Sequence, residues 1–300
     1  MATDFGPFVF GGNVLGWTAD RETSFRILDE FVARGGKSID SADSYAAWVP
    51  GNQGGESETI LGEWMAARKN REKVHVATKV GMWDKRPGLS AKNIRAAVED
   101  SLRRLQTDYI DLYYAHQDDD AAPQEEYVRT FDELVREGKV RALGVSNFSP
   151  ERLESALKIA KDGGLNGFSV SQDHWNLVER EIEQGVVPVL KKHGLVELPY
   201  FSLASGFLTG KYRPGAKVDS QRAGGAARYL ENPKNLQILE AMDVIAARHN
   251  VSHAAVALAW LRAQSPVGAP IASARTPDQL DALFEVQKLS LSAEELKSLG

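Results

Sequence analysis

The sequence predicts an α/β fold, a (β/α)8 TIM barrel that forms a single domain over residues 1–300. Short segments rich in β-branched or aromatic residues alternate along the chain with segments of helical periodicity. Parallel strands need a crossover long enough to hold a helix, so this alternation indicates a parallel sheet. The length also suits a barrel, because α/β barrels of this size commonly form one domain.

Eight segments carry the strand pattern. In chain order they cover residues 8–10, 38–40, 74–78, 109–114, 140–145, 168–171, 195–200 and 269–273. An open, doubly wound sheet is the alternative arrangement of alternating strands and helices. The chain contains no G-x-G-x-x-G, the usual nucleotide-binding motif of such sheets, and this favours the barrel.

The helix expected between the third and fourth strands has the clearest pattern. Ile94, Val98, Leu102 and Leu105 recur at helical spacing behind Ser90, which can cap the first turn.

Two later helices are expected to begin with a capping hydroxyl followed by proline. These starts are Ser149-Pro150 and Thr276-Pro277. In the second, Gln279 is expected to complete a capping box with Thr276.

Composition excludes several classes of protein. Hydrophobic residues make up 43% and charged residues 26%, as in ordinary globular proteins. The net charge of -5, without a Lys/Arg cluster, argues against nucleic acid as a partner. The chain has no cysteine, so disulfides and cysteine metal sites are excluded. We see no signal peptide and no membrane-spanning apolar run, and we expect a cytoplasmic monomer or weak homo-oligomer. Residues 213–232, rich in glycine and arginine, are expected to form a long loop.

The active site of such a barrel is built at the carboxyl ends of the strands. Nearly all residues at or just beyond the predicted ends are polar. The residues at or just beyond these ends are Asn13, Asp40, Lys79, His116, Ser146, Asn147, Gln172, Phe201, Ser202 and Ser273. Tyr45 follows in the loop after the second strand, and the glycines of GNQGG let that loop turn before a helix expected to begin near Glu56.

Four of these side chains could form a proton-transfer site. An ammonium such as Lys79, oriented by Asp40, is expected to lower the pKa of the Tyr45 phenol from about 10, so that the phenol serves as a general acid. Each residue alone has a simpler explanation. Asp40 can cap a turn, and Lys79 can keep its ammonium in water at the rim. His116 can be a solvated histidine, and Tyr45 a half-buried tyrosine with one hydrogen bond.

Taken together, the motifs resemble those of the aldo-keto reductase family. In order they are DSADSY, GESETILG, ATKVG, LYYAHQDD, LGVSNF, SQDHWN, YFSLASGFLTGKY and IASARTPDQL, over about residues 8 to 290. The resemblance implies a barrel that binds NADP(H) without a Rossmann domain and reduces aldehydes or ketones by hydride transfer. It also implies that Tyr45 donates the proton, that Asp40 and Lys79 adjust its pKa, and that His116 orients the carbonyl.

The same resemblance implies contacts with the cofactor. Ser146, Asn147 and Gln172 would bond to the nicotinamide carboxamide, and Trp175 would stack on the ring where the family usually has tyrosine. The remaining cofactor residues would be Gly12, Asn13, Asp40, Phe201, Ser202, Leu203, Ala204, Gly206, Leu208, Lys211, Ser273, Arg275 and Gln279. Within this set, Ser273, Arg275 and Gln279 would favour a 2′-phosphate. Ala282 and Leu283 replace a Glu-Asn pair that often holds adenine, so the preference for NADP over NAD stays open.

Three tryptophans follow the first three strands. Trp17, Trp48 and Trp83 are expected, with His116, to line an apolar substrate pocket, although ordinary packing explains each tryptophan about as well.

Two other functions fit a barrel. A metal-dependent hydrolase would need converging histidines and carboxylates, but the six histidines show neither H-x-H nor H-E-x-x-H, so we expect no metal. A cofactor-binding regulatory subunit, similar to the β-subunits of potassium channels, is the alternative within the same fold. The complete set of four proposed catalytic residues favours an enzyme acting on a small carbonyl substrate.

Overall fold

The computed structural model describes residues 4–216, 218 and 223–300. Its strands form one parallel sheet in the order β7-β6-β5-β4-β3-β2-β1-β8. They are β1 (Val9–Gly11), β2 (Ser38–Asp40), β3 (His75–Val80), β4 (Ile110–Ala115), β5 (Val140–Ser146), β6 (Val170–Gln172), β7 (Val196–Glu197) and β8 (Ile271–Ala272). Each predicted strand segment therefore overlaps a strand.

The sheet closes on itself through two sets of contacts. On one side β8 pairs in parallel with β1, and Val9 lies opposite Ile271. On the other side the Glu197 amide donates to the Pro266 carbonyl at 3.1 Å, and the Gly268 amide donates to the Glu197 carbonyl at 2.9 Å. The predicted single-domain (β/α)8 barrel is confirmed.

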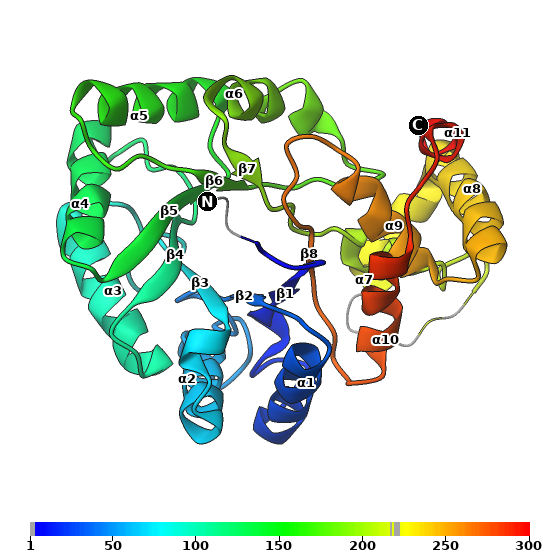
Figure 1. The fold of residues 1–300 in the computed structure, drawn as a ribbon, viewed down its shortest axis with the longest axis horizontal. Helices are drawn as coiled ribbons and strands as arrows, with labels where there is room; N and C mark the ends of the chain where they lie inside the picture. The colour runs from blue at the N-terminus through cyan, green and yellow to red at the C-terminus, as the bar shows by residue number, and fades with distance from the viewer. Residues whose placement is uncertain (1–3, 217, 219–222) are drawn as a thin grey trace.

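Helices surround the strands (Figure 1). They are α1 (Arg21–Ala33), α2 (Glu56–Arg68), α3 (Ala91–Leu105), α4 (Gln124–Arg136), α5 (Pro150–Asp162), α6 (Val186–His193), α7 (Ala223–Ala227), α8 (Pro233–His249), α9 (His253–Arg262), α10 (Gln279–Phe284) and α11 (Ala293–Ser298). Short 3-10 turns are η1 (Gly12–Val14), η2 (Arg71–Lys73), η3 (Glu181–Glu183), η4 (Ala204–Thr209), η5 (Arg228–Glu231) and η6 (Glu285–Lys288). Figure 1 shows α1 to α6 around the outside of the strands, with α7 to α11 gathered on one side.

Two of the predicted helix starts are confirmed. Ser90 accepts a hydrogen bond from the Asn93 amide, and Ser149 accepts one from the Arg152 amide with Pro150 in the first turn of α5. Both caps satisfy an amide that the first turn of a helix leaves without a partner.

The predicted capping box at Thr276 is wrong. The Gln279 and Leu280 amides donate to the Thr276 and Pro277 carbonyls, so a tight turn precedes α10. The Gln279 side-chain oxygen instead accepts from the Arg275 amide at 2.8 Å. The hydroxyl of Thr276 therefore caps no helix, since α10 begins only at Gln279, without a side-chain cap.

The boundaries of two predicted strands and the prediction of one long loop also need correction. Strands β7 and β8 are two residues long, shorter than the predicted 195–200 and 269–273. Residues 213–232 are not a simple loop, because α7 and η5 occupy 223–231. The predicted loop otherwise includes residues 217 and 219–222, which lie outside the described part of the chain.

Alternation along the strands divides the core into two layers. On β4, Tyr113 faces outward and packs against Phe131 of α4, with the ring centroids 5.7 Å apart. Its neighbour Tyr114 faces the barrel interior, in a cluster that includes Val9 and Leu198. The outer layer joins the strands to the helices, and the inner layer fills the barrel.

Candidate active site

A cavity of about 1110 Å³ opens at the carboxyl ends of the strands; we call it the C-terminal cavity. Residues that follow every strand of the barrel contribute to its wall, as expected for this architecture. The predicted site residues that line it are Asn13, Trp17, Asp40, Tyr45, Trp48, His116, Ser146, Asn147, Gln172, Phe201, Ser202, Leu203, Gly206, Lys211, Ser273, Arg275 and Gln279.

Asp40, Lys79 and Tyr45 form a connected group at the floor of this cavity. Strand register places Asp40 opposite Ala77, and Lys79 lies two residues further along β3 on the same face. The Lys79 ammonium donates to Asp40 Oδ2 at 2.6 Å, to the Tyr45 hydroxyl at 3.0 Å and to the Ser41 carbonyl at 2.7 Å. The Tyr45 hydroxyl in turn donates to Asp40 Oδ2 at 3.1 Å.

Two of these groups lie away from bulk water, whereas Tyr45 is half-buried and lines the cavity. Lys79 is 0% exposed and Asp40 is 2% exposed. Burial, and then the neighbouring Asp40 carboxylate, raises the pKa of the Tyr45 phenol well above its usual value. The expected lowering of this pKa by Lys79 is therefore wrong. The phenol keeps its proton at neutral pH, so it is in the form that can donate.

His116 lies beside Tyr45, and the centroids of the two rings are 6.1 Å apart. Burial, followed by the charge of Lys79, lowers the pKa of His116 well below its usual value. The imidazole is therefore neutral at physiological pH. A neutral imidazole can orient a substrate oxygen with one N–H without adding a charge to the site.

Asn147 is the centre of a second hydrogen-bonded group. Its side-chain nitrogen donates to the His116 carbonyl at 3.0 Å and to the Ser146 hydroxyl at 2.9 Å. The Tyr200 hydroxyl donates to its side-chain oxygen at 2.8 Å. Behind it, the Asp173 carboxylate accepts from the Asn147 amide at 2.9 Å and supports a backbone with φ of 58°. These bonds fix both ends of the Asn147 carboxamide.

Gln172 links the two groups. Its side-chain nitrogen donates to Asp40 Oδ1 at 2.9 Å, and both side chains are buried. The carboxylate of Asp40 thus accepts hydrogen bonds from Gln172, Lys79 and Tyr45, which compensates for its burial.

Two cations, Lys211 and Arg275, also line the cavity. Neither forms an ion pair within residues 4–216, 218 and 223–300. Ser273 donates to the side-chain oxygen of Asn13 at 2.8 Å, joining the loops after β8 and β1. Unpaired cations in a concave wall favour an anionic ligand.

Several predicted residues lie outside the cavity wall, because their side chains or backbone serve the fold. Ala204 and Leu208 are 0% exposed and belong to the outer core. A Cβ on Gly12 would lie 2.7 Å from the Asp40 carbonyl, so glycine is required there for close packing against β2. Trp83 packs over Gly54 and beneath the Arg86 guanidinium, outside the lining of the cavity.

Trp175 does not line the cavity, although the sequence predicts that it stacks on the nicotinamide ring. It is 2% exposed, packs edge-on against Trp260 and donates to Glu183 at 3.1 Å. Tyr200 is the aromatic ring that lines the cavity beside Asn147. The sequence contains a signal for Tyr200, because this residue directly precedes Phe201 at the predicted end of the seventh strand.

Trp17 and Trp48 form the aromatic part of the wall. Their rings meet edge-to-face at 5.6 Å, and Trp48 also lies 6.2 Å from the Tyr45 ring. Trp48 is 51% exposed. Met82 lines the same wall in the place expected for Trp83. An exposed tryptophan beside a buried phenol is suited to cover an apolar ligand.

Two further features are absent from the described part of the chain. No group of histidine and carboxylate side chains there could hold a metal ion. None of its helices is both long enough and apolar enough to cross a membrane.

The chain belongs to the aldo/keto reductase family, whose sequence model matches residues 7–300. An aryl-alcohol dehydrogenase of Pestalotiopsis microspora is 31% identical, with 98% of this chain and 77% of the relative covered. Norsolorinic acid reductase B of Aspergillus parasiticus is 32% identical, over 98% of this chain and 78% of the relative.

The name of a third relative includes a cofactor, NADP(+). The aryl-alcohol dehydrogenase [NADP(+)] of Phanerodontia chrysosporium is 31% identical, over 94% of this chain and 76% of the relative. Family membership shows that the protein is an oxidoreductase of the class that interconverts carbonyls and alcohols.

Proposed function

We propose that the protein reduces aldehydes or ketones to alcohols with NADPH, and that Tyr45 donates the proton. One observation carries the proposal: a protonated phenol, a buried ammonium and a buried carboxylate meet at the floor of a cavity large enough for a dinucleotide and a substrate. Family membership supports the same reaction class.

The cavity wall fits NADPH in its chemistry. Asn147 offers its side-chain oxygen as an acceptor to a nicotinamide amide, Gln172 offers an acceptor and its second N–H, and Tyr200 offers a ring face. Lys211 and Arg275 offer charge to phosphates. Bound NADPH supplies the hydride that reduces the carbonyl carbon.

Each residue at the floor then has a distinct role. Tyr45 gives its proton to the carbonyl oxygen as negative charge develops there. The Lys79 ammonium, 3.0 Å from the phenol oxygen, stabilises the phenolate that remains. Asp40 holds Lys79 in place and charged. Neutral His116 donates one hydrogen bond to the same carbonyl oxygen and sets its orientation.

The substrate we propose is an apolar, aromatic carbonyl compound. Trp17, Trp48 and Met82 form an apolar wall near Tyr45. Two relatives are named aryl-alcohol dehydrogenases, and this name supports an aromatic substrate class.

The test is NADPH oxidation by the purified protein with matched aromatic and aliphatic aldehydes. We expect turnover with both and a higher kcat/KM for the aromatic series. Tight NADPH binding without turnover of any aldehyde or ketone would indicate a cofactor-binding regulatory protein instead.

A further inference from the structure

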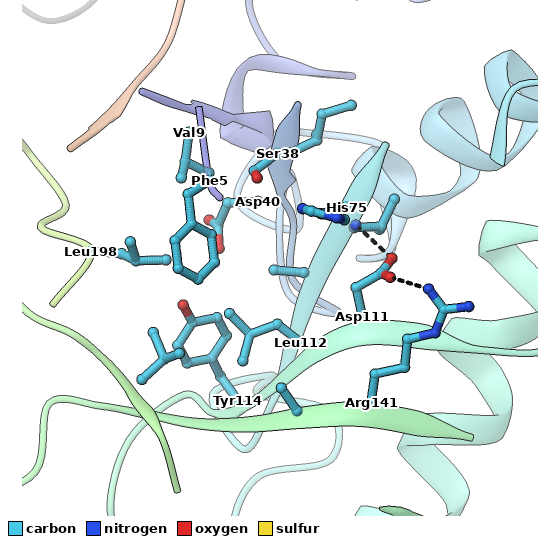
Figure 2. A pocket seen from close by; sticks show the side chains of 15 residues that line it. Phe5, Val9, Ser38, Asp40, His75, Asp111, Leu112, Tyr114, Arg141 and Leu198 are labelled. Atoms are coloured by element: carbon cyan, nitrogen blue, oxygen red, sulfur yellow. Dashed lines mark hydrogen bonds and ion pairs between the residues drawn. The ribbon is translucent and has the colours of Figure 1, made fainter. Parts of the chain in front are cut away.

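A second cavity of about 160 Å³ lies inside the barrel, on the opposite side of Asp40 from the C-terminal cavity. We call it the inner cavity; Figure 2 shows its lining. Most of its wall is apolar and comes from Val9, Leu112, Leu198 and other members of the inner core layer. Phe5, from the segment before β1, projects into its centre (Figure 2).

Three polar atoms in this wall have no hydrogen-bond partner among the described residues. They are the Tyr114 hydroxyl, the Ser38 hydroxyl and His75 Nδ1; the Tyr114 hydroxyl lies near the Gln172 side chain but does not meet hydrogen-bond geometry with it. Tyr114 is 0% exposed and Ser38 is 4% exposed, so bulk water does not satisfy them. Leaving each of these groups without a partner would cost about 1–3 kcal/mol. A cavity of this volume with several polar atoms in its wall is suited to hold ordered water.

The two cavities share one residue of the candidate site, Asp40. Its carboxylate projects toward Phe5 and Tyr114 in Figure 2. The same carboxylate accepts the hydrogen bond of the Tyr45 hydroxyl at 3.1 Å. Asp40 therefore lies between the inner cavity and the phenol that lines the C-terminal cavity.

The far end of the inner cavity approaches solvent. Its lining there includes Asp111 and Arg141, and the Arg141 guanidinium donates to Asp111 at 2.9 Å. The Arg141 side chain is 59% exposed, so this ion pair lies at the surface of the barrel. Besides this ion pair, the lining carries the polar side chains of His75, Ser38 and Asp40.

We propose that the inner cavity holds a chain of water molecules that returns a proton to Tyr45 from the amino-terminal end of the barrel. The proposal rests on the carbonyl reduction proposed above, which consumes one proton for each carbonyl reduced. Because Tyr45 lines the C-terminal cavity, a substrate bound there would separate the phenol from solvent on that side, and this path would supply the proton before the product leaves.

The proton balance is simple. The Tyr45 O–H bond breaks as its proton moves to the substrate oxygen, which leaves a phenolate. A water in the inner cavity protonates Asp40, and Asp40 passes a proton along the 3.1 Å contact to the phenolate oxygen. Asp40 is again a carboxylate, the phenol is restored, and solvent at the far end replaces the proton that the water chain has lost. Lys79 stays charged throughout.

Neighbouring tyrosines on β4 supply a matched pair of variants. Tyr114→Phe removes a hydroxyl that lines the inner cavity. Tyr113→Phe removes an equally buried hydroxyl that faces the outer layer and likewise has no hydrogen-bond partner among the described residues. Ala142→Leu adds bulk to the wall of the inner cavity without removing any polar group.

The first experiment does not depend on activity. A high-resolution crystal structure of the protein without ligands should show ordered water bonded to Tyr114 Oη, Ser38 Oγ and Asp40. An inner cavity without water, or one that takes up xenon under pressure, would overturn the proposal.

The second experiment compares proton uptake with hydride transfer in a single turnover, using a pH indicator dye and NADPH absorbance. In the unmodified protein and Tyr113→Phe, uptake should keep pace with hydride transfer. In Tyr114→Phe and Ala142→Leu, uptake should be about tenfold slower, while hydride transfer keeps its rate. Equal uptake rates in all four proteins would overturn the proton path. Absence of hydride transfer in the unmodified protein would instead contradict the proposed function.

Discussion

The Lys79 ammonium lies 2.6 Å from the Asp40 carboxylate, and neither group is exposed by more than 2%. A buried ion pair of this kind contributes little net stability, because removing both charges from water costs about as much as their attraction returns. Removing only one of the two charges is destabilising. One charge without the other is a buried, uncompensated ion.

Lys79→Met should therefore lower the free energy of unfolding by about 3–5 kcal/mol. The double variant with Asp40→Asn should recover part of that loss, since no unpaired charge remains. Denaturant titration of the three proteins measures both effects. If the single and double variants were equally destabilised, the pair would not be electrostatically coupled as the geometry indicates.

Asp43 predicts a pH dependence of stability. Burial, followed by the charge of Glu58, raises the pKa of Asp43 from 3.8 to about 7. Between these values the folded protein holds a proton that the unfolded chain has lost, so the free energy of unfolding falls as pH rises. The total loss is about 4 kcal/mol at most.

Asp43→Asn should remove this dependence and raise stability above pH 7. Thermal or denaturant unfolding from pH 4 to 8 tests it, with Asp120→Asn as a control, since the Asp120 side chain is 93% exposed. A profile for Asp43→Asn that falls with pH as steeply as that of the unmodified protein would contradict the assignment.

Tyr200, and not Trp175, should determine nicotinamide binding. Tyr200→Ala removes the ring beside Asn147 and should weaken NADPH binding about tenfold, as expected for the loss of one aromatic stacking contact. Trp175→Phe should lower the melting temperature but leave the NADPH dissociation constant within about twofold. Fluorescence titration with NADPH and thermal melts distinguish the two residues. If Trp175→Phe weakened NADPH binding and Tyr200→Ala did not, the prediction that Trp175 stacks on the nicotinamide would be restored.

Arg275 should provide the preference for NADPH over NADH. Arg275→Ala should weaken NADPH binding about tenfold or more and leave NADH binding unchanged, because charge-assisted bonds to a phosphate contribute about 1.5–3 kcal/mol. Arg103→Ala is the control, since that side chain is 72% exposed and pairs with Asp100. Equal losses for both cofactors would assign Arg275 to a part of the ligand that they share.

The sequence predicts the barrel, and the convergence of the four proposed catalytic residues, for a physical reason. Strand ends in a closed parallel sheet point to one rim, so Asp40, Lys79 and His116 needed only correct strand positions to converge. Tyr45 needed the loop after β2 to fold back over Asp40, and five residues leave little other choice. These contacts follow from topology.

Side-chain direction in loops does not follow from topology. Trp175 and Tyr200 both lie beyond strand ends, and only packing decides that Trp175 turns toward Trp260 and Tyr200 toward the cavity. The pKa of Tyr45 is a similar case. Its direction depends on how completely burial outweighs the neighbouring ammonium, and burial is a property of the whole barrel.

Tyr45→Phe tests the central claim most directly. The variant keeps the ring between Trp48 and His116 and removes only the hydroxyl that Lys79 and Asp40 contact. Steady-state turnover should fall by about a hundredfold or more, as expected for loss of a general acid, while the NADPH dissociation constant stays within about twofold. Turnover within about twofold of the unmodified protein would show that another group supplies the proton.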